Sequence, residues 1–443
     1  MYALLLLVTS KVLQVVSALV AVRIMTEYLS PSELGMHYIV STVIALMSFG
    51  LLNPLGIFYG RFIVGWHQNN TLVPITNVFL RIRLLLLIPA LLISWIIYNH
   101  LDYSDFTPLS IFLASITILF ISQNHGFLLN VLNILVSIEK FAYYSIVTTL
   151  LSFGFASILL LKTASGYAWL VGQAIGQCLI IIPIYLLIKR LPNGQKSAPD
   201  PGQPINVYAV LIYIAPVTAT LFLQWFMSSS YRLFTEQTFS LDKLAELGVG
   251  LFISAAVFQN LENIITQLVM PHYLRRITSQ FQLDRALAIN SLLHLVLPVF
   301  VTVLIYTIIM SPWLLKLLVA ASYHHLYLYV AVGGIIEFSR VLINQISNIA
   351  HSELKPLYQT ICYIPGSIAL FLLLFFIEET HNIMSILFAL LISQTIVLIS
   401  ISLIMNRLIE YNIDIKNLFV KVIFLSPPLL LFLPLVNMYA HLA

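Results

Sequence analysis

Long apolar stretches recur along the whole length of this sequence. Thirteen of them are about 20 residues long or more, the length that an α-helix needs to cross a bilayer. With 60% hydrophobic and 9% charged residues, the chain could not hide that much apolar surface in a soluble domain. The sequence therefore predicts an all-α polytopic membrane protein with twelve core spans and a thirteenth, proline-interrupted C-terminal span. We place the spans at 3–28, 36–60, 78–98, 107–137, 141–162, 166–188, 206–231, 246–272, 285–309, 325–350, 357–378, 382–406 and 418–440.

A polar, proline- and glycine-rich segment, RLPNGQKSAPDPGQP, divides the chain at residues 190–204. Six predicted spans precede it. Because six is even, the second half enters the membrane from the same side as the first, which predicts two parallel repeats. We therefore expect an N-terminal six-helix lobe at 1–189, a cytoplasmic linker at 190–205, a C-terminal six-helix lobe at 206–409 and an extra helix at 410–443.

The distribution of loop charge predicts the orientation, because cytoplasmic loops carry an excess of Lys and Arg. With the N-terminus inside, fourteen basic residues lie on the cytoplasmic side and five on the other, so we expect a cytoplasmic N-terminus and an external C-terminus. The cytoplasmic set is Arg61, Arg81, Arg83, Lys140, Lys189, Arg190, Lys196, Arg275, Arg276, Arg285, Lys355, Arg407, Lys416 and Lys421.

Two predicted spans carry a polar stripe. Glu337 and Arg340 share a helix face with Asn344 and Ser347, within an otherwise apolar segment. An earlier span repeats the spacing with Gln123, Gly126, Asn130 and Asn133. Because charged and polar groups at membrane depth normally face a bundle interior or a water-filled path, the stripes indicate the walls of a cavity.

Five basic residues are candidates for binding an anionic substrate in that cavity: Arg340, Lys11, Arg23, Arg61 and Arg232. Snorkelling of a long side chain to the membrane interface is the alternative, and it explains Arg61 and Arg232 well.

Two acids are candidates for ion coupling. Glu262 has no basic partner three or four residues away, so it could take up and release a proton during transport. The alternative is a structural role, in which Glu262 joins two helices through hydrogen bonds. Glu337 could do the same, although we favour a local pair with Arg340.

Several chemistries find no support in the sequence. It holds no phosphate-binding glycine loop with its lysine, no zinc-spaced set of ligands and no Ser-His-Asp order. Cys178 and Cys362 both lie in predicted spans as small apolar residues. We therefore expect no enzyme activity, no cofactor, no metal and no nucleic-acid partner. Short outer loops argue against a membrane glycan polymerase or ligase.

Four segments resemble polysaccharide flippases of the Wzx type. KVLQVVSALVAVRIMTEYLSPSELGMHYIV (11–40) is similar to their opening, where a basic residue precedes a turn into the second span, as Arg23 does here. FGLLNPLGIFYGRFI (49–63) is similar to the end of their second span. LGVGLFISAAVFQNLENIITQLVMPHYLRRI (247–277) and VGGIIEFSRVLINQISNIAHSELKPLYQTI (332–361) resemble their eighth and tenth spans.

The resemblance implies the multidrug/oligosaccharidyl-lipid/polysaccharide (MOP) exporter superfamily, with two six-helix lobes around a V-shaped cavity. It implies a bacterial inner-membrane flippase that moves an undecaprenyl-pyrophosphate-linked oligosaccharide to the periplasmic leaflet by ion-coupled alternating access. O-antigen or lipopolysaccharide synthesis would be the setting, with a polymerase and chain-length proteins as partners.

The five candidate cations and two candidate acids have a net charge of about +3, the sign that a pyrophosphate needs in a low-dielectric site. A small-molecule exporter of the multidrug and toxin extrusion (MATE) type is the alternative within this superfamily, and a glycan polymerase or ligase is the alternative from another class.

Overall fold

The computed structural model describes residues 2–101, 108–191, 207–269, 273, 282–353, 355–377, 382–411 and 414–426. Every regular element within these ranges is a helix. Eleven candidate membrane spans occur in this part of the chain, and they correspond to the predicted spans one to six and eight to twelve. The predicted seventh span lies in α9 (Val207–Thr238), which is 32 residues long. The prediction of an all-α polytopic membrane protein is confirmed.

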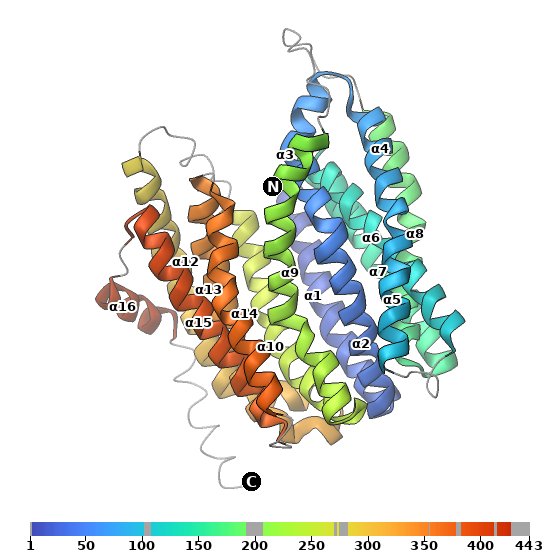
Figure 1. Cartoon of the computed structure of the whole chain (residues 1–443), viewed down its shortest axis with the longest axis vertical. Coiled ribbons are helices and arrows are strands. Elements are labelled where there is room, and N and C mark those ends of the chain that lie inside the picture. Colours follow the sequence, from blue (N-terminus) through green and yellow to red (C-terminus); the bar gives the residue numbers. More distant parts are fainter. Residues whose placement is uncertain are drawn as a thin grey trace. The chain divides into compact units, whose positions relative to one another are not determined.

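Two predicted segments lie largely outside the described residues. The linker at 190–205 is described only as far as Leu191, and the thirteenth span at 418–440 only as far as Ser426. Within the described part, that span begins as α16 (Ile415–Leu425), which Figure 1 shows lying across the long helices around it. Arg275 and Arg276 of the orientation argument also lie outside the described residues.

Two compact units make up the chain, Met1–Ala245 and Glu246–Ala443. Their boundary falls inside α10 (Leu241–Leu268) rather than at the linker. In the first unit α9 packs against α2 (Pro31–Met47) and α3 (Asn53–Gln68), and the indole nitrogen of Trp225 donates a hydrogen bond to the carbonyl of Thr42 (3.1 Å). The division into lobes at 190–205 stays a prediction.

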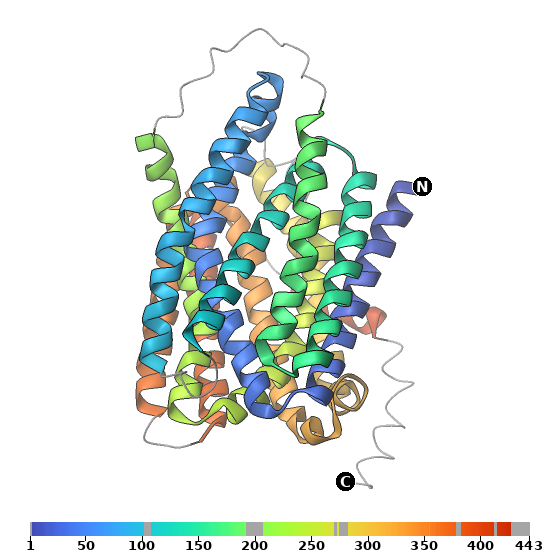
Figure 2. The same ribbon diagram turned by 90° about the vertical axis from the view of Figure 1, so that its right-hand side faces the viewer.

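The first unit also contains α1 (Tyr2–Tyr28), α4 (Leu72–Leu85), α5 (Leu87–Leu101), α6 (Leu109–Leu135), α7 (Ile138–Thr163) and α8 (Gly166–Lys189). Figure 2 shows α4 and α5 end to end, and together they form one candidate span, Leu72–His100. The helices α7 and α8 lie against each other because Gly172 and Gly176 lack side chains. A Cβ atom at either glycine would overlap the backbone of Ala156 or Ser152 on α7. Small residues four apart allow this close approach of membrane helices.

An aromatic and aliphatic core lies between α3, α4, α6 and α8. Tyr59, Phe79 and Phe127 meet edge to face there, with ring centroids 4.7–5.1 Å apart along the Tyr59 contacts. The Tyr59 hydroxyl and the Thr76 hydroxyl are 2.6 Å apart, which satisfies both groups in this buried position. This core fixes the helices that surround the pocket described below.

The second unit consists of the rest of α10, α12 (Gln282–Leu318), the 3₁₀ helix η3 (Ala321–Leu326), α13 (Tyr327–Ser352), α14 (Pro356–Ile377), α15 (Met384–Leu408) and α16. The Ser254 hydroxyl on α10 donates to the carbonyl of Val330 on α13 (2.7 Å). Phe258 on α10 and Phe300 on α12 lie 6.5 Å apart, both completely buried. The first contact joins α10 to α13, which places their polar stripes together, and the second joins α10 to α12.

Candidate functional site

The helix that lines the first pocket, α3, follows a change of helix geometry at Asn53–Pro54. Pro54 has no backbone N–H to donate to the preceding turn, so the regular hydrogen-bond ladder cannot continue through it. The chain forms a π-helix, η1 (Ser48–Leu52), in which the Asn53 N–H donates to the carbonyl of Ser48. Single π turns inside α-helices occur frequently at functional sites. The Leu52 carbonyl at the end of this turn accepts a hydrogen bond from Arg83.

Arg83 is the most deeply buried basic side chain at this pocket, with 3% of its surface exposed. Its guanidinium donates to the Asn124 side-chain oxygen (Nε, 2.8 Å), the Leu52 carbonyl (Nη1, 2.9 Å) and the Gln123 carbonyl (Nη2, 3.4 Å). It also lies 4.8 Å from the centre of the Phe127 ring.

All of these partners are neutral, and Arg83 forms no ion pair within the described residues. A buried cation is normally paired with an acid, because desolvation makes an uncompensated charge expensive. Arg83 lies inside the candidate span Leu72–His100, and charged groups within such spans normally face a bundle interior or a water-filled path. The arrangement thus leaves an uncompensated positive charge that a bound anion could neutralise.

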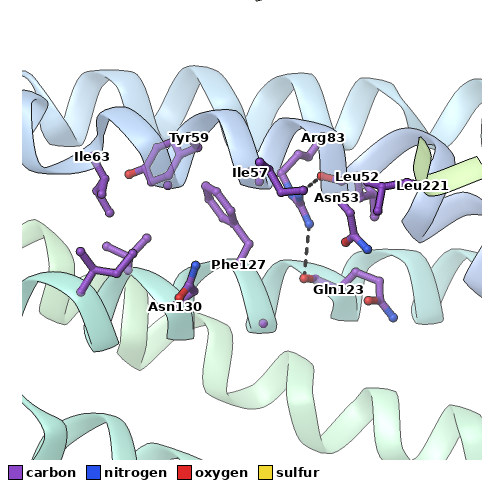
Figure 3. A pocket seen from close by; sticks show the side chains of 15 residues that line it. Leu52, Asn53, Ile57, Tyr59, Ile63, Arg83, Gln123, Phe127, Asn130 and Leu221 are labelled. Carbon is purple, nitrogen blue, oxygen red and sulfur yellow. Dashed lines mark hydrogen bonds between the residues drawn. The ribbon is translucent and has the colours of Figure 1, made fainter. Parts of the chain in front are cut away.

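Amides and glycines from two helices surround Arg83 in a pocket of about 490 Å³. Asn53, Gly56 and Gly60 come from α3, while Gln123, Gly126 and Asn130 come from α6. Figure 3 shows the guanidinium of Arg83 between Leu52 and Gln123, with Asn130 further along α6. The predicted stripe on α6 therefore lines a real cavity at Gln123, Gly126 and Asn130, whereas Asn133 is exposed and does not line it.

The second polar cluster lies in the other unit, between α10 and α13. Arg340 donates through Nε to Glu337 (2.7 Å) and through Nη1 to Glu262 (3.0 Å), while the Asn344 amide donates to the other oxygen of Glu262 (2.8 Å). These charged side chains are 15–21% exposed. One guanidinium between two carboxylates gives a net charge of −1 when all three are ionised.

This cluster refines two sequence-based interpretations. The local pair of Glu337 and Arg340 is present. Glu262, which has no basic partner on its own helix, is paired with Arg340 from α13. Ser347 on the same stripe is buried, and its hydroxyl donates to the Asn344 carbonyl (2.8 Å). Arg340 is thus held by acids, and its Nη2 atom is buried without a hydrogen-bond partner in the described part.

The other four predicted cations do not line the Arg83 pocket. Lys11 donates to Gln14 on its own helix (3.2 Å) and lies 5.8 Å from the Phe141 ring. Arg23 pairs with Glu27 (3.0 Å) at a half-exposed position.

The remaining two occupy different surroundings. Arg61 is exposed, as expected for snorkelling. Arg232 lies 5.4 Å from the ring of Tyr38 and 5.7 Å from that of Tyr231.

Arg83 is the residue that sequence reasoning missed as a site and instead counted as a loop charge. The segment LRIRLLLL reads as the basic edge of a span that starts at 78, but the helix starts at Leu72. That earlier start moves both Arg81 and Arg83 into the span, so neither counts as a loop charge and the orientation argument then has twelve basic residues against five. The signal that could have found it is the apolar character of residues 72–80, which continues the span upstream.

No group of three or more His, Cys, Asp or Glu side chains could hold a metal ion within the described ranges. Both cysteines are free thiols. The two clusters differ in charge: Arg83 is an uncompensated cation in one unit, and the cluster in the other unit is acidic.

No protein-family model matches this sequence, and no curated protein matches it. Solved structures do match. The lipid II flippase MurJ, in an inward closed conformation, is similar with a TM-score of 0.64 and 14% identity, over 95% of this chain and 90% of that one. An inward-facing multidrug resistance MATE family transporter of the MOP superfamily has a TM-score of 0.60 and 12% identity, over 90% and 95%. A MOP superfamily transporter from Pyrococcus furiosus has a TM-score of 0.59 and 12% identity, over 92% and 94%. The chain has the MurJ/MATE-like polytopic fold.

Proposed function

We propose that this protein is a flippase of the MOP type that moves a pyrophosphate-linked oligosaccharide, carried on an undecaprenyl lipid, from the cytoplasmic to the periplasmic leaflet. Its location would be a bacterial inner membrane, with a cytoplasmic N-terminus. The fold supports transport by alternating access. The observation that carries the substrate class is Arg83, a buried cation inside a candidate membrane span whose partners are neutral.

A pyrophosphate fits the Arg83 pocket on electrostatic grounds. Arginine binds phosphate oxygens through a planar fork of N–H donors, and charge-assisted hydrogen bonds are about twice as strong as neutral ones. Gln123, Asn130 and Asn53 add amide donors and acceptors around it. The pocket therefore offers both a counter-charge for the phosphates and polar partners for the hydroxyl groups of a sugar.

The acidic cluster supports ion coupling. With a net charge of −1, Glu262, Glu337 and Arg340 could take up a proton or a sodium ion, which would alter the pairing between α10 and α13. An ion drives alternating access only if it binds the two conformations with different affinity. Glu262 is the candidate coupling group because its two oxygens have partners on the neighbouring helix.

A MATE-like exporter of small organic cations is the second candidate, since the same acidic cluster favours a cationic ligand. The two functions differ in the sign of charge that the transported molecule presents. Within the described residues the Arg83 pocket contains no acid, which favours the anion. The polymerase or ligase alternative has no comparable support.

A deletion strain tests the proposal. We expect cells that lack this protein to accumulate lipid-linked oligosaccharide in the inner leaflet, and we expect the wild-type gene to restore surface polysaccharide. Accessibility of the glycan to a membrane-impermeant label in inside-out vesicles measures the accumulation. Normal surface polysaccharide together with increased sensitivity to cationic compounds would instead identify a small-molecule exporter.

A further inference from the structure

Three glycines in the pocket wall have no packing reason to be glycine. A Cβ atom at Gly56, Gly60 or Gly126 would meet no atom within 4 Å, and all three line the Arg83 pocket. Gly172 and Gly176, in contrast, lie where two helix backbones touch. Glycine also destabilises a helix interior by about 0.5–1 kcal/mol relative to alanine. The absence of side chains at the pocket therefore keeps space open.

On both helices the glycines share one face with amide side chains. Asn53, Gly56 and Gly60 are spaced i, i+3, i+7 on α3, which places them on one face. On α6, Gln123, Gly126 and Asn130 have the same spacing. Arg83 donates hydrogen bonds to the carbonyls of Leu52 and Gln123. Its charge therefore lies at the N-terminal end of both stripes.

Arg83 points to a ligand independently of the glycines. Arginine carries five N–H donors, and Arg83 forms three hydrogen bonds within the protein. At 3% exposure and with no acid beside it, this side chain has both charge and donors to offer to an anion in the pocket.

We propose that Gly56, Gly60 and Gly126 form the surface on which the first sugar ring of the substrate lies, next to the phosphate at Arg83. The helix backbone carries no side chains at these three positions and so leaves room for the ring, and the flanking amides bind its hydroxyl groups. The three glycines thereby set the limit on the bulk of that sugar. This inference rests on the proposed function and specifies the part of the substrate that the pocket recognises.

Binding measurements with two probes test the glycine surface. The first probe is inorganic pyrophosphate, and the second is a short-chain prenyl pyrophosphate that carries one N-acetylhexosamine. In Gly60→Leu we expect the ratio of the dissociation constant of the second probe to that of the first to rise about tenfold, because added methylene groups occupy the space of the ring. Titration of the purified full-length protein in lipid nanodiscs gives both constants.

Gly65→Leu is the matched control, because Gly65 lies on the same helix, its Cβ would also enter open space, and it does not line the pocket. We expect its ratio to equal that of the wild type. An unchanged ratio in Gly60→Leu, with binding of both probes dependent on Arg83, would overturn the glycine inference and leave the proposed function standing. If the wild type binds neither probe, the proposed function itself is wrong. Should Gly60→Leu fail to reach the membrane, Gly126→Val answers the same question by the same ratio.

Discussion

Replacing Arg83 by glutamine is expected to reduce export of the lipid-linked oligosaccharide by about 100-fold, because hydrogen bonds to a charged group each contribute about 1.5–3 kcal/mol. Glutamine keeps a polar group that can bond to Asn124 but removes the charge. Lysine keeps the charge and loses the planar fork, so we expect an intermediate rate for Arg83→Lys. Export is measured as labelled surface polysaccharide in the deletion strain, normalised to the amount of protein in the membrane.

Arg81→Gln is the matched control for this experiment. Arg81 lies two residues before Arg83 on α4, is exposed and does not line the pocket. We expect it to export at the wild-type rate. Wild-type export by Arg83→Gln would show that the head group binds elsewhere.

Replacing Arg340 by alanine is expected to destabilise the protein by about 3–5 kcal/mol, because it leaves two partly buried carboxylates without their counter-charge. Export should then fall together with the amount of folded protein. Thermal unfolding of the purified protein measures the loss. Arg407→Ala is the control, since Arg407 is an exposed arginine of the same unit, and we expect its unfolding temperature to stay unchanged.

A neutral triple variant separates stability from coupling in this cluster. Glu262→Gln, Glu337→Gln and Arg340→Met together remove all three charges, and such replacements of a buried ionic triad are often neutral or stabilising. We expect this variant to regain thermal stability and to lack ion-coupled transport. An Arg340→Ala protein as stable as the wild type would contradict the prediction that Arg340 stabilises the two carboxylates.

Eleven of the thirteen predicted membrane spans match candidate spans in the described part of the chain, because apolar length decides such spans. Span boundaries were less accurate, and a shift of a few residues changes the role of a residue near an edge. The third span illustrates this: placing its start at 78 made Arg83 a loop charge, whereas the helix from Leu72 buries it. The break at Asn53–Pro54 was visible as a proline in an apolar run, but the hydrogen bond from Arg83 to the Leu52 carbonyl depends on α4 lying alongside.

Helical periodicity could not predict which polar residues on different helices pair with each other. The helical spacing identified Glu337 with Arg340, three residues apart, and the stripe Gln123, Gly126 and Asn130. It could not identify the bond between Glu262 and Arg340, which are 78 residues apart. A long-range pair of this kind follows from how α10 packs on α13, where Gly250 and Gly333 allow the close approach.

Translocation in reconstituted vesicles tests the central claim most directly. Purified protein is placed in vesicles with a labelled undecaprenyl-pyrophosphate-linked oligosaccharide, and a proton or sodium gradient is imposed. We expect the glycan to become accessible to an enzyme on the opposite side, at a rate that depends on one of the gradients. Arg83→Gln should slow this movement by about 100-fold, and Glu262→Gln should remove its dependence on the gradient. Vesicles in which the wild-type protein moves the glycan no faster than protein-free vesicles under either gradient would contradict the account.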